Sequence, residues 1–343
     1  MKKLWIHTVR GYIKLGLFFY FKKIEVLNSD IISKNQPVLI LGNHQNALLD
    51  ALLIATTTKR FSYFLTRAGV FKNPLISKTL KSLNMIPVYR IRDGWNNLTN
   101  NNAVFKSCAD LLNKNEAIAI FPEGNHNLQR KVRPLSKGFT RIVFDALDKN
   151  PELDLQLVPV GLNYEKPEFF GDSVSIVYGN LIEAKQFNSN NRNESIIKLK
   201  STIFNDLTKL TTHIPSDNYD KTLKKLEKGN VDFLKPDSVN QCISTNFENC
   251  NSVNKNRFST VKLFFKTLLI LMLFVPYIIW KFAIQPKVKE KEFMATFRFA
   301  IAITLVPAFI LIVMLVLGNV FSFTIAFLYL FMVLLLELSA VKL

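Results

Sequence analysis

The chain has 343 residues, of which 49% are hydrophobic, and its 44 Lys and Arg residues against 26 Asp and Glu residues give a formal net charge of +18. This length allows one large domain or two smaller ones, and the basic balance points to an anionic partner: nucleic acid, anionic lipid or a phosphorylated substrate. Cys108, Cys242 and Cys250 have no metal-ligand spacing, so we expect no zinc site and no disulfide framework, as in a reducing compartment.

The N-terminal residues 1–29 contain an apolar and basic segment at 4–21. Lys2 and Lys3 are not followed by a long apolar core with a cleavage site, which argues against a cleaved signal peptide. Charges at Arg10 and Lys14 interrupt any membrane-spanning stretch, so the segment predicts an amphipathic helix lying in the membrane interface. A core helix with basic edges is the alternative.

Residues 30–214 alternate between apolar runs and helical patterns, which predicts a globular α/β domain. Val158-Pro159-Val160 contains an internal proline, which places that strand at an edge or a bulge. The expected strands are 38–41, 61–65, 86–89, 117–121, 156–160 and 174–178, and the expected helices are 47–56, 74–83, 99–113 and 138–147.

Residues 215–256 are polar and rich in Asn, Ser and Lys, which predicts a linker with a short basic helix at 221–228. The membrane region follows at 257–343. Its segments 299–317 and 320–337 are long enough to cross a hydrocarbon core of ~30 Å, and they carry no charge before Glu337. Gly318-Asn319 between them predicts the turn of a transmembrane hairpin.

The segment 261–280 is less regular, because Lys262, Lys266 and Pro276 interrupt it. Basic residues flank it on both sides, which conflicts with a simple crossing under the positive-inside rule. We therefore favour an interfacial or re-entrant segment, which leaves both basic flanks on the cytosolic side. A true crossing, with one flank outside, is the alternative.

His44 and Asp50 stand out where a predicted strand passes into a predicted helix. A histidine can exchange a proton near neutral pH, and a carboxylate can orient its ring and stabilise the charged form. Six residues along one helix give a net rotation of about 240° around its axis, so the two side chains would point apart. They can meet only if His44 lies in the turn before the helix; an ordinary helix Asp and loop His are the alternative.

Three further stretches follow predicted strands. Phe121-Pro122-Glu123-Gly124 is a turn that presents Glu123 at a strand end. Arg90 and Arg92 could bind phosphate through a planar fork of donors, although Arg92 before Asp93 could equally be a solvated pair. Lys137 precedes a predicted helix, where it could bind an anion or belong to an ordinary basic loop.

Taken in order, these stretches make residues 30–185 resemble the glycerolipid acyltransferases, which acylate glycerol phosphate and lysophosphatidate. The resemblance lies in Asn43 to Asp50 for the H-x-x-x-x-D block, Arg90 for the second block, Phe121 to Gly124 for F-P-E-G, and Val158-Pro159-Val160 for the fourth. It implies a mixed sheet flanked by helices.

The resemblance also implies a reaction. His44 acts as general base and Asp50 orients it, while Arg90, Arg92 and Lys137 hold the acceptor phosphate and Glu123, with its neighbours Pro122 and Gly124, binds a glycerol hydroxyl. The acyl donor is acyl-CoA or acyl carrier protein, with no further cofactor and no metal. The expected enzyme is integral to an anionic lipid membrane, with its catalytic domain on the cytoplasmic face.

Two departures from the family pattern are visible. One extra residue separates His44 from Asp50, as in a branch resembling yeast-type glycerol phosphate acyltransferases. Asn125-His126-Asn127 follow F-P-E-G where the family often has an arginine and a serine. Arg130, Arg133 or Lys137 could replace that positive charge, and His126 is interpreted as a substitute polar contact rather than a second base.

Other readings remain open. A lyso-aminolipid acceptor would make Arg90 and Lys137 dispensable. The chain could also be a catalytically silent adaptor that binds anionic lipid, although His44, Asp50 and Glu123 together argue against that. A nucleic-acid partner is disfavoured, because the basic residues are not interleaved with exposed aromatic residues in a recognisable motif.

Overall fold

A computed structural model describes residues 1–89, 99–253 and 259–343. Its centre is an eight-stranded sheet with the order β1-β7-β6-β2-β5-β3-β4, and β8 pairs with β6 beyond the end of β7. Pairing is parallel throughout, except that β6 is antiparallel to β7 and β8, so the sheet is mixed as expected. The strands are Lys23–Leu27, Val38–Gly42, Ser62–Arg67, Met85–Val88, Ala117–Ile120, Gln156–Tyr164, Ser173–Tyr178 and Ile182–Glu183.

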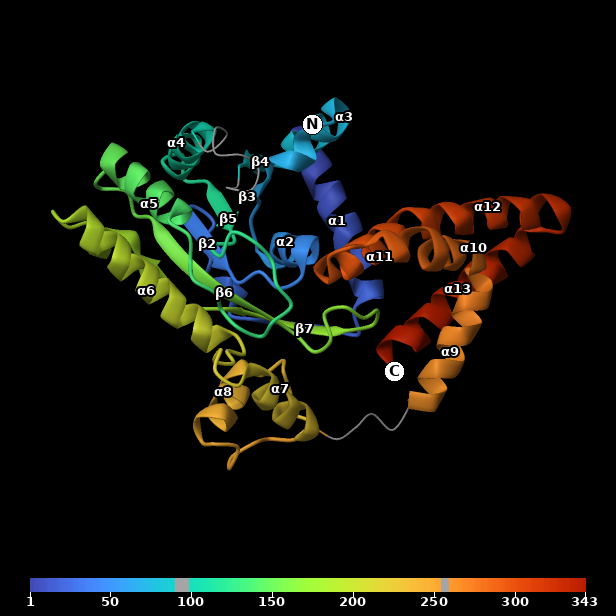
Figure 1. Cartoon of the computed structure of the whole chain (residues 1–343). Helices are drawn as coiled ribbons and strands as arrows, with labels where there is room; N and C mark the ends of the chain where they lie inside the picture. Colours follow the sequence, from blue (N-terminus) through green and yellow to red (C-terminus); the bar gives the residue numbers. More distant parts are fainter. Residues whose placement is uncertain (90–98, 254–258) are drawn as a thin grey trace.

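Helices cover both faces of the sheet (Figure 1). The central strands are apolar on both faces, which is typical of a largely parallel sheet. One face packs against α4 (Asn100–Leu112), α5 (Gly138–Lys149) and α6 (Arg192–Leu210). The other packs against α1 (Lys2–Tyr20), α2 (Ala47–Thr57) and α11 (Met294–Ile303). The short α3 (Pro74–Ser82) lies outside both clusters.

The sheet begins before residue 30, where the α/β domain was expected to start. Strand β1 pairs in parallel with β7 along its whole length, from Lys23 opposite Ser173 to Leu27 opposite Val177. The sequence predicts no strand at 23–27, because five residues of mixed polarity carry too weak an alternation to indicate one.

The strand that carries Pro159 is interior, so its expected place at an edge or bulge is wrong. Strand β6 lies between β2 and β7. The Pro159 carbonyl accepts from Gly179 N, on the side away from β2. On that side β8 pairs with residues 156–157 and β7 pairs from Val160 onward, so the missing N–H falls in the gap between the two ladders.

The expected linker is folded up to residue 253. Helix α7 (Tyr219–Lys228) matches the short helix expected there, and α8 (Pro236–Ser244) was not anticipated. Both surround a small core of Ile214, Leu226, Val231, Phe233, Val239 and Cys242. The Asn240 side chain donates to the carbonyls of Thr208 and Thr211 at 3.0 and 2.9 Å, which fastens this unit to the end of α6.

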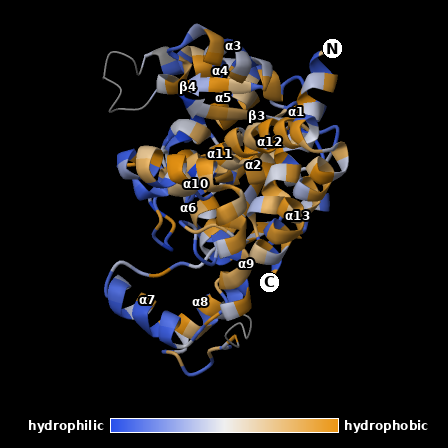
Figure 2. Cartoon of the chain, turned by 90° about the vertical axis from the view of Figure 1, so that its right-hand side faces the viewer, coloured by the Kyte–Doolittle hydropathy of each residue, from blue (hydrophilic) through white to orange (hydrophobic). Residues whose placement is uncertain are grey.

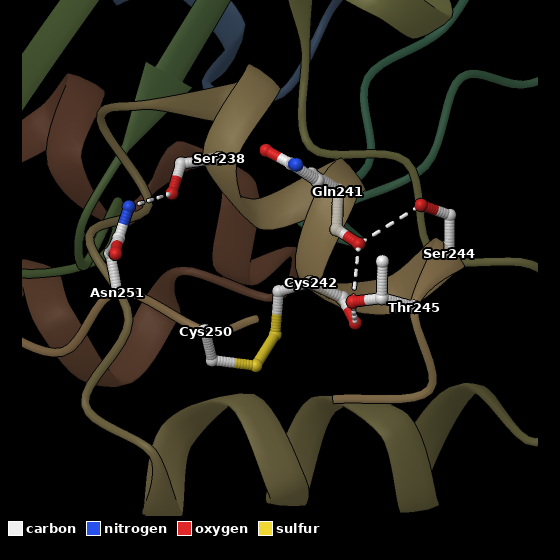
Figure 3. Close-up of a disulfide and its surroundings, with 7 residues drawn as sticks. All are labelled: Ser238, Gln241, Cys242, Ser244, Thr245, Cys250 and Asn251. Atoms are coloured by element: carbon white, nitrogen blue, oxygen red, sulfur yellow. Dashed lines mark hydrogen bonds between the residues drawn. A yellow bond between two sulfur atoms is a disulfide. The ribbon is translucent and has the colours of Figure 1, made fainter. Parts of the chain in front are cut away.

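A disulfide joins Cys242 to Cys250 within this small unit, contrary to the expectation of no disulfide (Figure 3). Beside it, Asn251 donates to Ser238 Oγ at 3.2 Å (Figure 3). The spacing of eight residues did not predict this disulfide, because two cysteines can pair only where the fold brings their backbones together. Here the turn after α8 does so. Cys108 is a buried thiol.

Two helical stretches, Lys291–Val320 and Phe323–Lys342, are long and apolar enough to cross a membrane. The first contains α11 and α12 (Leu305–Val320), and the second is α13 (Phe323–Lys342). The ribbons of these helices are coloured hydrophobic along most of their length, whereas that of α7 is largely hydrophilic (Figure 2). The hairpin turn lies at Phe321 and Ser322 rather than at Gly318-Asn319, because α12 continues to Val320 and the Ser322 side chain caps α13.

The segment before the hairpin is a bent pair, in which Thr260–Met272 and Phe274–Lys287 meet at 100°. It contains α9 (Ser259–Met272), α10 (Phe274–Ile278) and a π-helical turn, Ile279–Ile284. At the bend, Tyr329 on α13 donates to Met272 O at 3.2 Å. The bend therefore packs against the middle of the hairpin rather than its tip. A bend of this kind fits the expected interfacial or re-entrant segment, and it fits a broken span as well.

Candidate active site

The candidate site forms where β2 ends and α2 begins. The Asn43 side chain prolongs the β2–β6 pairing, since its amide donates to Leu162 O at 3.1 Å and its oxygen accepts from Leu162 N at 2.7 Å. His44 follows in the turn, as the spacing required. The turn then passes through Ala47, whose φ of +38° lies in the left-handed region that costs a non-glycine residue about 1–2 kcal/mol.

Asp50 and His44 are brought together by this turn. Asp50 Oδ2 lies 2.8 Å from His44 Nδ1 and also accepts from Asn46 N at 2.7 Å. Its other oxygen, Oδ1, accepts from Tyr164 OH at 2.6 Å. The Asp50 side chain is fully buried, and these three partners give a buried carboxylate the hydrogen bonds that its charged form needs.

The His44 ring rests on the phenyl ring of Phe121, with 4.1 Å between centroids and 11° between planes. Gly42 makes room for this platform, because a Cβ there would lie 3.1 Å from Phe121 and 3.3 Å from Ile54. The imidazole is thus held by a hydrogen bond at Nδ1 and by stacking on one face. Its side chain is 11% exposed, so the ring borders the surface rather than the core.

Glu123 enters the same site from the turn after β5. The turn is tight, since Gly124 has φ +78° and donates to Phe121 O at 3.0 Å. Glu123 Oε1 accepts from His44 N at 3.4 Å, and Oε2 accepts from Arg133 Nε at 2.5 Å. Burial raises the pKa of Glu123 to about 7, although Arg133 and the His44 N–H act in the opposite direction.

The loop after this turn returns beside it. Pro122 is buried and its carbonyl accepts from Ser136 N at 2.8 Å, which brings the loop that carries Lys137 next to the Glu123 turn. Lys137 is exposed and is the residue from which α5 starts. Arg90 and Arg92 lie outside the described residues.

Arg130 and Arg133, the two arginines that could replace the family's positive charge, both donate hydrogen bonds to protein groups. Arg133 pairs with Glu123. The Arg130 guanidinium donates to Tyr164 O and Glu165 O at 2.6 and 2.7 Å, and it lies 3.6 Å from the centroid of Phe233. Burial lowers the pKa of Arg130 to about 10. Arg130 therefore joins the loop, the end of β6 and the small α7–α8 unit.

His126 lies edge-on to His44, with 5.5 Å between ring centroids. Its Nε2 is 3.1 Å from Glu290 Oε2, and its ring meets Phe293 at 4.6 Å. The interpretation of His126 as a polar contact therefore agrees with the structure, but its partner comes from the membrane region, which the sequence did not indicate.

Sequence reasoning missed Tyr164 and the platform role of Phe121. A signal for Tyr164 was present: Val158, Val160, Leu162 and Tyr164 alternate, so all face the side of the sheet that α2 covers. Across the described ranges 1–89, 99–253 and 259–343, no group of three or more His, Cys, Asp or Glu side chains is placed to hold a metal ion.

Comparisons with known proteins match the part of the chain that carries His44, Asp50 and Glu123. The sequence model of the family described as Acyltransferase matches residues 23–163. Glycerol-3-phosphate O-acyltransferase 1 of Saccharomyces cerevisiae is 29% identical over 114 residues, and 1-acyl-sn-glycerol-3-phosphate acyltransferase BAT2, chloroplastic, of Brassica napus is 25% identical over 120 residues. Residues 23–163 therefore match the Acyltransferase family model, and both of these relatives are glycerolipid acyltransferases by name. The matched length is short: the two alignments cover 32% and 35% of this chain, and 15% and 33% of the relatives.

A solved structure is similar to part of this chain. The crystal structure of the 1-acyl-sn-glycerophosphate acyltransferase PlsC from Thermotoga maritima is 17% identical, covers 59% of this chain and 79% of its own, and has a TM-score of 0.42. The family match begins with β1 at Lys23, before the expected start at residue 30. It ends at Asn163, one residue before Tyr164.

Proposed function

We propose that this protein is a membrane-associated O-acyltransferase. It transfers a fatty acyl group from an acyl thioester to the hydroxyl of a glycerol phosphate or lysophosphatidate acceptor. The observation that carries the proposal is the contact of 2.8 Å between His44 Nδ1 and Asp50 Oδ2 at a strand end of an acyltransferase domain. The buried Asp50 carboxylate, which is contacted by His44, Asn46 and Tyr164, argues against a catalytically silent lipid-binding adaptor, because lipid binding alone does not require such a group.

In the proposed reaction, His44 acts through Nε2, because Nδ1 faces Asp50. The acceptor hydroxyl gives its proton to Nε2 while its oxygen forms a bond to the thioester carbonyl carbon. The carbon–sulfur bond then breaks, and the departing thiolate takes the proton from His44. Asp50 stabilises the imidazolium between these steps. General base catalysis of this kind contributes about 10²–10⁴-fold.

The remaining site residues have proposed roles in binding. Glu123, held by Arg133 and by the His44 N–H, orients a glycerol hydroxyl near the base, and Pro122 and Gly124 shape its turn. Lys137 binds the acceptor phosphate. Arg90 and Arg92 keep the same role on the basis of the family resemblance alone. The donor is acyl-CoA or acyl carrier protein.

We also propose that the catalytic domain lies on the cytoplasmic face, beside an anionic lipid surface. Both basic flanks of the bent pair contact this domain: Lys262 lies against Gly171, and Arg298 donates to Glu168 O at 2.8 Å. A segment whose two ends contact the same domain is better described as re-entrant than as a crossing. The α12–α13 hairpin then supplies the transmembrane anchor.

A lyso-aminolipid acceptor remains a second candidate. It is favoured by Arg130 and Arg133, because both donate to protein groups rather than face an open site. Such an acceptor carries no phosphate, so substituting Lys137 or Arg90 by Ala would leave its acylation unchanged.

The experiment uses membranes that contain the full-length protein, a radiolabelled acyl thioester and a panel of acceptors: glycerol 3-phosphate, lysophosphatidate and lyso-aminolipids. His44→Ala should abolish product while membrane association is kept. His7→Ala is the matched control, because His7 lies on α1 and packs against Phe61, away from the site. Appreciable transfer by His44→Ala would refute the assignment of the base, and transfer to lyso-aminolipids alone would select the second candidate.

A further inference from the structure

The membrane region touches the acyltransferase site at one junction. Glu290 Oε2 lies 3.1 Å from His126 Nε2, and the Phe293 ring meets the His126 ring at 4.6 Å and 79°. The His126 side chain is only 8% exposed, whereas that of Glu290 is 55% exposed. Because His126 is edge-on to His44, residues just before α11 lie one side chain away from the proposed base.

Three lysines and two glutamates, Glu290 and Glu292, lie at this junction. Lys287, Lys289 and Lys291 are all exposed and surround Glu290 between the π-helical turn and α11. No other part of the described membrane region has three lysines within five residues. Their positive charge therefore lies at the end of the membrane segments that faces the catalytic domain.

Both arginines of the catalytic loop bond to protein groups, while Lys137 is exposed. Arg133 donates to Glu123, and the Arg130 guanidinium donates to two carbonyls beneath Phe233. An acceptor phosphate near His44 needs cationic donors, since charge-assisted hydrogen bonds are the strong ones for phosphate. The exposed lysines Lys287, Lys289 and Lys291 lie on the same short segment as Glu290, which contacts His126.

We propose that residues 285–293 form the membrane-side wall of the acceptor site. In this arrangement Lys289 and Lys291 bind the phosphate of a glycerol phosphate or lysophosphatidate acceptor. The pair of His126 and Glu290, supported by Phe293, fastens the wall to the catalytic loop, so His126 is a positioning residue. This inference rests on the proposed acyltransferase function and assigns the phosphate contact to the anchor instead of the loop alone.

The first test measures Michaelis constants in membranes, with glycerol 3-phosphate and lysophosphatidate as acceptors. The double variant Lys289→Ala/Lys291→Ala should raise the acceptor KM at least about tenfold and leave the thioester KM unchanged. Lys221→Ala/Lys224→Ala removes the same charge from exposed positions on α7 and should change neither constant. Equal changes in both constants, or none, would overturn the inference.

The positioning role of His126 has its own readout. His126→Ala removes the contact with Glu290, whereas His126→Gln keeps a side-chain donor that can bond to Glu290. We expect His126→Ala to raise the acceptor KM severalfold and His126→Gln to restore it toward the wild-type value. If the two variants behave alike, the contact with Glu290 does not position the wall.

A binding measurement separates this inference from the proposed function. In the His44→Ala background, vesicles of neutral phosphatidylcholine that contain the protein are titrated with lysophosphatidate. The Lys289→Ala/Lys291→Ala change should weaken binding about tenfold even though nothing turns over. Unchanged binding would reject the wall while leaving the reaction intact; weakened binding with no acyl transfer by the wild type would keep the wall and reject the proposed function.

Discussion

Tyr164 donates its phenolic hydrogen to Asp50 Oδ1 at 2.6 Å, from the end of β6 to the first turns of α2. The other oxygen of Asp50 is shared by His44 Nδ1 and Asn46 N. Burial and the neighbouring Asp50 charge raise the pKa of Tyr164 well above its ordinary value, so it remains a donor at every relevant pH. The orientation of the His44–Asp50 pair thus depends on a residue more than a hundred positions away.

Tyr164→Phe removes this donor without removing the ring. A hydrogen bond to a charged group contributes about 1.5–3 kcal/mol, so we expect kcat to fall about 10–100-fold. Both Michaelis constants should stay near their wild-type values, because Tyr164 contacts Asp50 rather than either substrate. Steady-state kinetics on membranes check this. An unchanged kcat would mean that Asn46 and His44 suffice to hold Asp50.

Asp50→Asn keeps the shape of the side chain and removes its charge. A neutral amide cannot stabilise the imidazolium that forms when His44 takes the proton, so kcat should fall by about 10³-fold or more. Thermal unfolding in detergent checks that the variant folds. Activity within tenfold of the wild type in a folded variant would contradict the role of Asp50.

Glu123 should make the stability of the protein depend on pH. Its pKa is about 7 in the folded protein against an ordinary value of 4.5, so the folded state keeps a proton that the unfolded state has lost. Stability from this group is therefore present below pH 4.5 and is lost as the pH rises to 7, by up to about 3 kcal/mol. In Glu123→Gln, the fall in Tm between pH 5 and pH 8 should be smaller than in the wild type. An equal fall in both proteins would show that Glu123 does not titrate in this range.

Gly161 is required by the close approach of α6 to β6. A Cβ at this position would lie 2.1 Å from the backbone oxygen of Leu210, which cannot move without shifting the helix end. Gly161→Ala should therefore lower the free energy of unfolding by about 1–3 kcal/mol or more. Gly11→Ala is the control, since a Cβ there meets nothing within 4 Å. Equal Tm values for the two variants would contradict the close packing.

The topology predicts two different outcomes for protease protection. A tag within residues 285–292 should be cleaved from the same side of the membrane as the catalytic domain, because Glu290 contacts His126. A tag at Phe321 and Ser322, in the turn of the hairpin, should be protected from that side. Protection of the first tag would mean that the bent pair crosses the membrane.

Much of the domain was predictable from local pattern. Apolar runs such as 38–41 and 117–121 form the central strands, because a largely parallel sheet buries both of their faces. The separation of His44 from Asp50 required His44 to lie outside the helix, and it does. The charge-free stretches near the C-terminus indicated two long apolar helices, although the cap at Ser322 moved the turn between them.

The sequence by itself was sufficient for features that depend on neighbouring residues. These are the strand and helix periods, the turn that holds His44, and the length of the apolar helices. The tertiary structure decided which distant groups meet. It put Tyr164 on Asp50, Glu290 on His126 and Cys242 on Cys250, and it placed the proline-containing strand inside the sheet. Periodicity reports the face of an element but not the element that covers that face, and these contacts depend on the packing of the whole chain.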